Sequence, residues 1–181
     1  MSSSIKKLIV MLVLVVAFIS CNQNPTLQTY FVDHELKPGF TSIDIPTSLL
    51  NIDQTNLTEE QKEAYKSIDK LNMLAFVMND SNKAEYETEL DKVKEILKDP
   101  KYEELMRGGN TTDGKFVVKF IGKEDSIDEL IIFGNANDKG FAVIRVLGDD
   151  MSASKVGKLY SALDTANINE SQISQFADFF K

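Results

Sequence analysis

Residues 127–151 read IDELIIFGNANDKGFAVIRVLGDDM, and this stretch decides the fold. Two runs rich in Ile, Val and Phe, at 127–133 and 141–147, flank the polar segment 134–140. Such runs suit a pleated, packed surface, and the polar segment between them is typical of a turn. The stretch therefore predicts two antiparallel strands joined by a short loop.

A third strand is predicted immediately upstream. Residues 115–121 (KFVVKFI) are again β-rich, and only residues 122–126 separate them from the first run. If both loops are short, Ile121 pairs with Ile127 and Phe133 pairs with Phe141. Because strand side chains alternate between faces, this register predicts one wholly apolar face, which carries Phe116, Val118, Leu130, Ile132, Ala142, Ile144 and Val146.

The opposite face of these strands is the candidate binding face. It carries the large apolar side chains of Val117, Ile131, Val143, Phe133 and Phe141. It also carries a row of alternating charge across the three strands, formed by Lys119, Glu129 and Arg145. Three charges rarely sit in a sealed core without pairing. We therefore expect this face to be partly open, with the charged row at its exposed side.

Length and composition set the class of protein. The chain has 181 residues, a formal net charge of −8 and 43% hydrophobic residues, which fits one ordinary globular domain. The acidic balance argues against a nucleic-acid partner, because phosphate binding needs clustered Lys and Arg. With one Cys in the chain, no internal disulfide can form.

The N-terminus predicts export and lipidation. Lys6 and Lys7 precede the apolar run 8–19, which is typical of a secretory signal peptide and short for a membrane span. Ser20 and Cys21 follow it and resemble the lipobox of bacterial lipoproteins, in which the cysteine is acylated. We therefore expect a signal peptide over residues 1–20, a lipidated tether over 21–25 and a single domain over 26–181.

The remaining elements are predicted from periodicity and capping signals. Strands are expected at 40–45 and 71–78. Helices are expected after Thr26, from Thr58 to about Lys70, from Ser81 to Lys98 and after Ser152, with a short last helix marked by Ile173, Phe176 and Phe180. Residues 102–106 are expected to form a short turn of helix and 108–114 a loop. The order predicts an α+β domain, whose mostly antiparallel sheet of about five strands has helices packed mainly on one face.

No catalytic, metal or cofactor site is predicted. Residues 109–115 have the spacing of a phosphate-binding loop, but Phe116 stands where Ser or Thr would hold Mg²⁺, and the loop precedes a strand. Asp149 and Asp150 suit the positive end of a helix dipole better than a cation, since no further ligands stand at motif spacing. His34 has no second His or Cys with which to share zinc and is predicted to be a packing residue.

Several of these segments together resemble a known family. The lipobox, residues 140–151, the Asp44-Ile-Pro segment with Thr47 and Ser48, and the strand that begins at Ile127 are similar to small bacterial lipoproteins grouped as domain of unknown function 4252. The resemblance covers about residues 27–163. Its motifs are structural, so it carries over no catalytic residue. It implies a lipid-anchored envelope protein with no established activity.

These patterns favour a non-enzymatic binding module, anchored through Cys21 and facing the periplasm. Its partners would be the membrane, through the lipid, and an envelope protein or ligand. Outer-membrane residence is preferred, because Asn22 is not the Asp that signals inner-membrane retention in the best-known sorting rule. The alternatives are a regulatory or sensory component of an envelope signalling system and, third, a hydrolase acting on envelope polymers.

Overall fold

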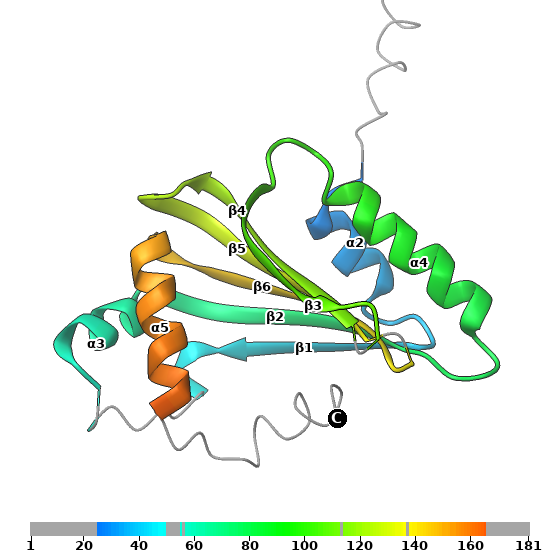
Figure 1. Cartoon of the computed structure of the whole chain (residues 1–181), viewed down its shortest axis with the longest axis horizontal. Coiled ribbons are helices and arrows are strands. Elements are labelled where there is room, and N and C mark those ends of the chain that lie inside the picture. The colour runs from blue at the N-terminus through cyan, green and yellow to red at the C-terminus, as the bar shows by residue number, and fades with distance from the viewer. Residues whose placement is uncertain (1–24, 50–54, 56, 113, 137, 166–181) are drawn as a thin grey trace, which may run out of the picture.

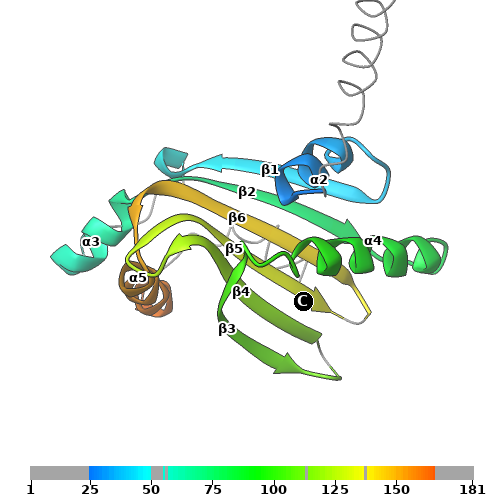
Figure 2. The ribbon, with the colours of Figure 1, turned by 90° about the horizontal axis from the view of Figure 1, so that it is seen from above.

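Six antiparallel strands form one curved sheet, with helices against both of its faces (Figures 1 and 2). The structure is a computed structural model, and it describes residues 25–49, 55, 57–112, 114–136 and 138–165. Its elements are, in order, α2 (Leu27–His34), β1 (Phe40–Pro46), a short 3-10 helix (Thr47–Leu49), α3 (Glu59–Lys66), β2 (Ile68–Val77), α4 (Lys83–Ile96), β3 (Glu103–Asn110), β4 (Gly114–Lys123), β5 (Ser126–Ala136), β6 (Gly140–Met151) and α5 (Ala153–Thr165).

The strand order is β1-β2-β6-β5-β4-β3, so the predicted three-stranded meander forms the middle and one side of the sheet. The predicted α+β class is confirmed, whereas the sheet has six strands instead of about five. The missed strand is β3, whose sequence EELMRGGN contains two adjacent glycines and reads locally as a turn. Pairing with β4, and not local propensity, makes it a strand.

The predicted register is wrong by two residues in both hairpins. Phe133 lies opposite Val143 instead of Phe141, and Ile121 lies opposite Glu129 instead of Ile127. The cause is that β5 continues through the polar and small residues 134–136, so that Ala136 and Gly140 close the hairpin. At the other end of β5, bulges in its pairing with β4 and with β6 shift the register again. Because a shift by two keeps every side chain on its face, the predicted faces are correct and the predicted rows are not.

Helices cover both faces of the sheet, so the expectation of packing mainly on one face is not confirmed. Side chains of α2 and α4 share a core cluster with Phe76, Ile131 and Phe141. On the other face, Ala153 and Val156 of α5 pack against a second cluster. We call the first the helix-covered face and the second, towards which the sheet curls, the concave face (Figure 2).

Capping signals located three helix starts correctly. Thr26 and Thr58 each form a capping box, with Thr29 and Gln61 respectively. Ser152 Oγ accepts a hydrogen bond from the Lys155 backbone N–H at the start of α5. Other bounds differ: α3 ends at Lys66 because β2 begins at Ile68, and α4 begins after Asn82 instead of Ser81.

Two groups of predictions fall on residues that the structure does not describe. They are the signal peptide with Cys21 and its tether as far as residue 24, and the last helix marked by Ile173, Phe176 and Phe180. Within the described ranges, no helix is long and apolar enough to cross a membrane.

Candidate binding surface

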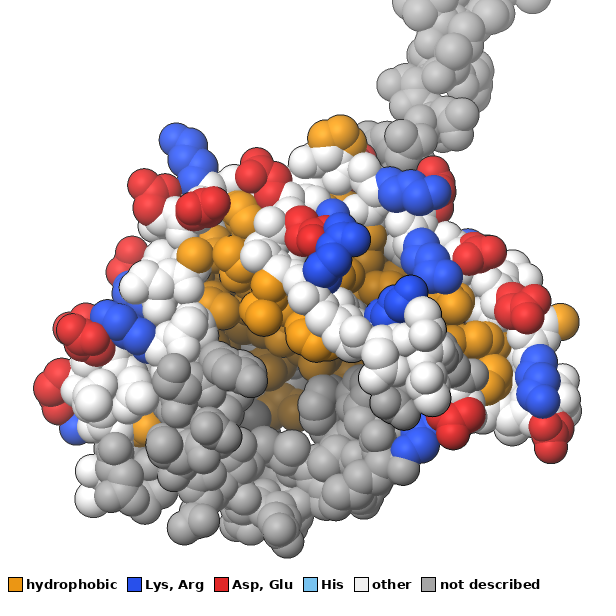
Figure 3. Space-filling model, viewed as in Figure 1, with side chains coloured by type: hydrophobic (Ala, Val, Ile, Leu, Met, Phe, Trp, Pro, Cys, Tyr) orange, Lys and Arg blue, Asp and Glu red, His pale blue; other side chains and the backbone are white. Residues whose placement is uncertain are grey.

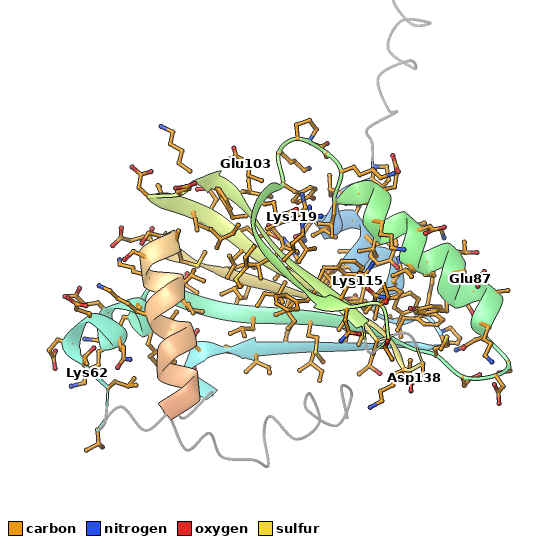
Figure 4. All side chains as sticks on the ribbon, in the orientation of Figure 1. Lys62, Glu87, Glu103, Lys115, Lys119 and Asp138 are labelled. Carbon is orange, nitrogen blue, oxygen red and sulfur yellow. The ribbon has the colours of Figure 1, made fainter. Side chains whose placement is uncertain are left out.

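The predicted charged row lies on one face of three adjacent strands, in a modified arrangement. Lys119 and Arg145 both stand opposite Ile131, and Glu129 is two residues along β5, diagonal to them. Arg145 Nε and Nη2 donate to the two oxygens of the Glu129 carboxylate at 2.5 and 3.0 Å. Lys119 Nζ donates instead to the carbonyl oxygen of Tyr102 at 2.8 Å (Figure 4). The row is therefore one ion pair with a separate lysine.

The face that carries this row is covered, and the expectation that it is partly open is wrong. Arg145 is 6% exposed and Phe141 is fully buried, with Phe133 beside it in the core cluster under α2 and α4. Helix α2 closes over the ion pair: Arg145 Nη1 donates to Gln28 Oε1 at 2.7 Å, and the guanidinium lies 5.3 Å from the centre of the Phe31 ring. The Arg145 guanidinium, the Glu129 carboxylate and the Lys119 ammonium each have a hydrogen-bond partner, so burial leaves none of the three unsatisfied. This face is not an accessible platform.

A second polar cluster, which the sequence analysis missed, joins α2 to α4. The Tyr30 hydroxyl donates to Glu89 Oε2 at 2.9 Å, and His34 Nε2 lies 3.2 Å from the same oxygen. Lys92 Nζ contacts the other Glu89 oxygen at 2.7 Å. His34 stacks on the Tyr30 ring with centroids 4.0 Å apart, which confirms its prediction as a packing residue. A signal was present: Glu89 stands three residues after Tyr86 and one before Leu90, on the buried stripe of its helix.

The pKa values in this cluster follow from burial and pairing. Burial raises the pKa of Tyr30, and the hydrogen bond to the Glu89 carboxylate and its negative charge raise it further. Burial also acts to raise the pKa of Glu89. Hydrogen bonds from Lys92 and Tyr30, with the nearby His34, outweigh that effect and hold the pKa of Glu89 below its usual value. The cluster thus keeps a phenol and a carboxylate between the two helices, where they connect α2 to α4.

The concave face has the opposite composition. One row of six directly paired residues crosses every strand, and all six side chains are apolar: Ile43, Met73, Ile144, Ile132, Val118 and Met106. The next row towards the α5 end contains Ile45, Leu71, Val146, Leu130 and Phe120. No charged side chain interrupts these rows from β1 to β4.

The row on the other side is built mostly of small residues, with one large ring at Phe116. It runs Thr41, Ala75, Ala142, Gly134, Phe116 and Gly108. The Phe116 ring lies over Gly108, where a Cβ atom would stand 2.6 Å from the ring. Figure 3 shows hydrophobic side chains gathered in a hollow on this side, between α5 and β3.

Described elements cover this face less than the other. Met106 is 50% exposed and Phe116 is 40% exposed, and both are large apolar side chains at its β3 side. Ile43, Leu71 and Ile132 are only partly buried. Among the described helices, α5 contributes contacts at one end, through Ala153 and Val156. Met73, Val118 and Ile144 of the six-residue row are 7–9% exposed, so the exposed apolar surface lies at the β3 side of this face, where it is a candidate binding site.

The weaker candidates have structural roles. Residues 109–115 span the β3–β4 hairpin, in which Asn110 pairs with Gly114, as expected for a turn before a strand. Asp149 and Asp150 lie near the end of β6, and Asp150 has a φ of 57° and pairs with Lys155 Nζ at 2.6 Å. No group of three or more potential metal-ligating side chains occurs in the described part of the chain.

A family model described as domain of unknown function (DUF4252) matches residues 34–159. The chain belongs to the DUF4252 family. No curated protein and no solved structure matches it. The DUF4252 match extends over all six strands, so both faces of the sheet lie within it. Helix α2 reaches the matched region only at its last residue, His34.

Proposed function

We propose that this DUF4252 protein is a lipid-anchored binding module of the cell envelope, which holds a hydrocarbon chain against its concave face. The observation that carries the proposal is the row of six apolar side chains that crosses the whole sheet, with Met106 and Phe116 exposed at its side. A hydrocarbon chain makes no hydrogen bonds. It therefore loses nothing on a surface that offers none, whereas a polar ligand would be left with unsatisfied groups.

The size of the face fits such a ligand. Six strands spaced about 4.8 Å apart span roughly 24 Å, which is comparable to an extended acyl chain. Each buried methylene contributes about 0.8 kcal/mol. About ten buried methylenes would thus contribute roughly 8 kcal/mol, which corresponds to micromolar affinity before the costs of association are subtracted.

The envelope location rests on the sequence of the N-terminus. Cys21 directly follows an apolar run and a small residue, as in bacterial lipoproteins. Acylation at Cys21 would place the mature domain on a membrane surface facing the periplasm, with two or more chains for stable attachment. Mass spectrometry of the native protein tests this, because an acylated N-terminal Cys21 is expected. An unmodified Cys21, or an unchanged membrane fraction for Cys21→Ala, would contradict the anchor.

The module acts by binding and not by catalysis in this proposal. The buried groups best suited to acid–base chemistry, Tyr30, His34 and Glu89, are already engaged with one another between α2 and α4. They lie on the helix-covered face, away from the concave surface. Turnover of an envelope polymer by the purified protein, lost on Glu89→Gln, would instead support the hydrolase.

The binding experiment uses the mature chain with Cys21→Ser, which stays soluble. Titration with palmitate in a calorimeter is expected to give one saturable site. Phe116→Asp and Met106→Asp place a charge on the concave face and should each weaken binding at least tenfold. The matched control is Leu36→Asp, since Leu36 is an apolar residue 92% exposed just after α2, on the other side of the sheet. Equal affinity for all three variants, or no palmitate binding, would refute the site.

A further inference from the structure

The chain continues beyond α5 with residues 166–181, whose sequence is ANINESQISQFADFFK. Ile173, Phe176, Ala177 and Phe180 stand at positions i, i+3, i+4 and i+7, the spacing of one helical face. Gln175 and Asp178 fall on the opposite side of the same helical projection. The segment therefore combines an apolar stripe with a polar back, which is the pattern of a helix that lies on an apolar surface.

The point at which the described chain ends leaves the stripe within reach of the concave face. Helix α5 ends at Thr165 and packs on that face through Ala153 and Val156. Eight residues, 166–173, lead from Thr165 to the start of the stripe and span up to about 28 Å when extended. A helix over 173–180 adds about 12 Å. Together these lengths exceed the width of the sheet, which is roughly 24 Å for six strands.

We propose that residues 173–180 lie on the concave face of the ligand-free protein and occupy the site of the apolar ligand. The stripe supplies two phenylalanines to a face that carries no charge between β1 and β4. Docking also covers Met106 and Phe116, the exposed apolar side chains at the β3 side. The occupation is independent of what else the face binds, whereas the competition with a ligand rests on the function proposed above.

Occupation is tested by disulfide cross-linking in the full mature chain with Cys21→Ser, which has no native thiol because the sequence holds one Cys. The test pair is Met106→Cys with Phe180→Cys, and the matched pair is Met106→Cys with Asp178→Cys, on the polar back. A mild oxidant should bridge the first pair within one molecule at least ten times faster than the second. Equal rates would overturn the proposal, and so would bridges formed only between two molecules, which would assign the face to a second copy.

Competition is tested by palmitate titration of the same chain. Phe176→Ser with Phe180→Ser removes most of the stripe, and Gln175→Ser with Asp178→Ser is the matched control. The first variant should bind palmitate at least tenfold more tightly than the parent, and the control should not differ from it. Equal affinities would refute competition. If no variant binds palmitate, the function proposed above fails, and the cross-linking rates still decide whether the segment occupies the face.

Discussion

The two faces of the sheet differ in a way that reverses the usual relation between charge and exposure. The helix-covered face holds the Arg145–Glu129 ion pair and the Glu89 cluster, and it is sealed under α2 and α4. The concave face carries no charge from β1 to β4, and described elements cover it less. Charge predicts exposure only when the charged groups lack partners. Here pairing makes burial tolerable on one face, whereas the other face exposes the apolar side chains of Met106 and Phe116 at its β3 side.

The largest expected effect comes from reversing one charge on the helix-covered face. Glu129→Lys places a cation against the Arg145 guanidinium, whose carboxylate partner is lost. Breaking a buried pair costs about 3–5 kcal/mol, and the added repulsion should bring the loss of unfolding free energy to about 5 kcal/mol or more. The control is Glu104→Lys at the exposed pair with Arg107, where about 0–1 kcal/mol is expected. If urea denaturation gave similar losses of unfolding free energy for the two variants, the difference in burial between the two ion pairs would not determine their contribution to stability.

Truncation of an aromatic ring on each face comes next. Phe141 is fully buried among Phe40, Phe76 and Phe133, so Phe141→Ala should cost about 4 kcal/mol. Phe116→Ala on the concave face should cost about 1 kcal/mol, because its ring is 40% exposed and packs on Gly108. Urea denaturation of both variants gives the difference. A larger loss at Phe116 would show that the concave face is part of the stabilising core.

The Glu89 cluster should make the helix-covered face sensitive to acid. The pKa of Glu89 is lower in the folded protein than in the unfolded chain, so the folded state binds its proton more weakly. This contribution to stability is present above the ordinary glutamate pKa of about 4.3 and is lost as the pH falls through the lower folded value. Glu89→Gln should cost about 2 kcal/mol at neutral pH and flatten the acid limb of the stability curve.

The matched control for this variant is Glu87→Gln, an exposed position on the same helix. Its stability curve should overlay that of the parent chain between pH 7 and 3. If Glu89→Gln also left the curve of stability against pH unchanged, the loss of stability in acid would have to come from other carboxylates.

The smallest effects are expected at the helix caps. Thr26→Ala and Thr58→Ala each remove a capping hydrogen bond, to Thr29 and Gln61, and should cost about 1 kcal/mol. Thr26 begins α2, whose Gln28 bonds to Arg145, whereas Thr58 begins α3, which has no such connection to the helix-covered face in the described residues. Thermal denaturation should give equal losses if the cap and the ion pair are independent. An excess at Thr26 would measure their coupling.

Sequence alone was sufficient for the class of fold, the face of each meander side chain and the start of three helices. These features depend on local patterns: alternation of apolar residues, and Thr or Ser followed three residues later by a partner. The register was predicted wrongly, because β5 continues to Ala136, beyond an apolar run that ends at Phe133. Strand β3 was missed because EELMRGGN has no strand signal of its own.

The site was harder to predict than the fold. The sequence placed Lys119, Glu129 and Arg145 on one face correctly, but exposure depends on what covers that face. The covering helix α2 is remote in sequence from the meander, and its Gln28 and Phe31 give no local indication that they contact Arg145. The apolar row across the concave face includes Ile43 and Met73 from strands outside the meander, so it was visible only once the strand order was known.

The bulge in β3 between Glu104 and Met106 has a consequence for how copies of the protein meet. Strands β1 and β3 form the two edges of the sheet, and an open edge is a template on which another chain can add a strand. On β3 the bulge interrupts the even spacing of backbone groups, and Glu103, Glu104 and Arg107 place charges along it. On β1, Pro46 ends the edge and donates no hydrogen bond. Both edges therefore disfavour growth of the sheet from one molecule into the next, so copies of the protein at high local concentration should not polymerise through their strands.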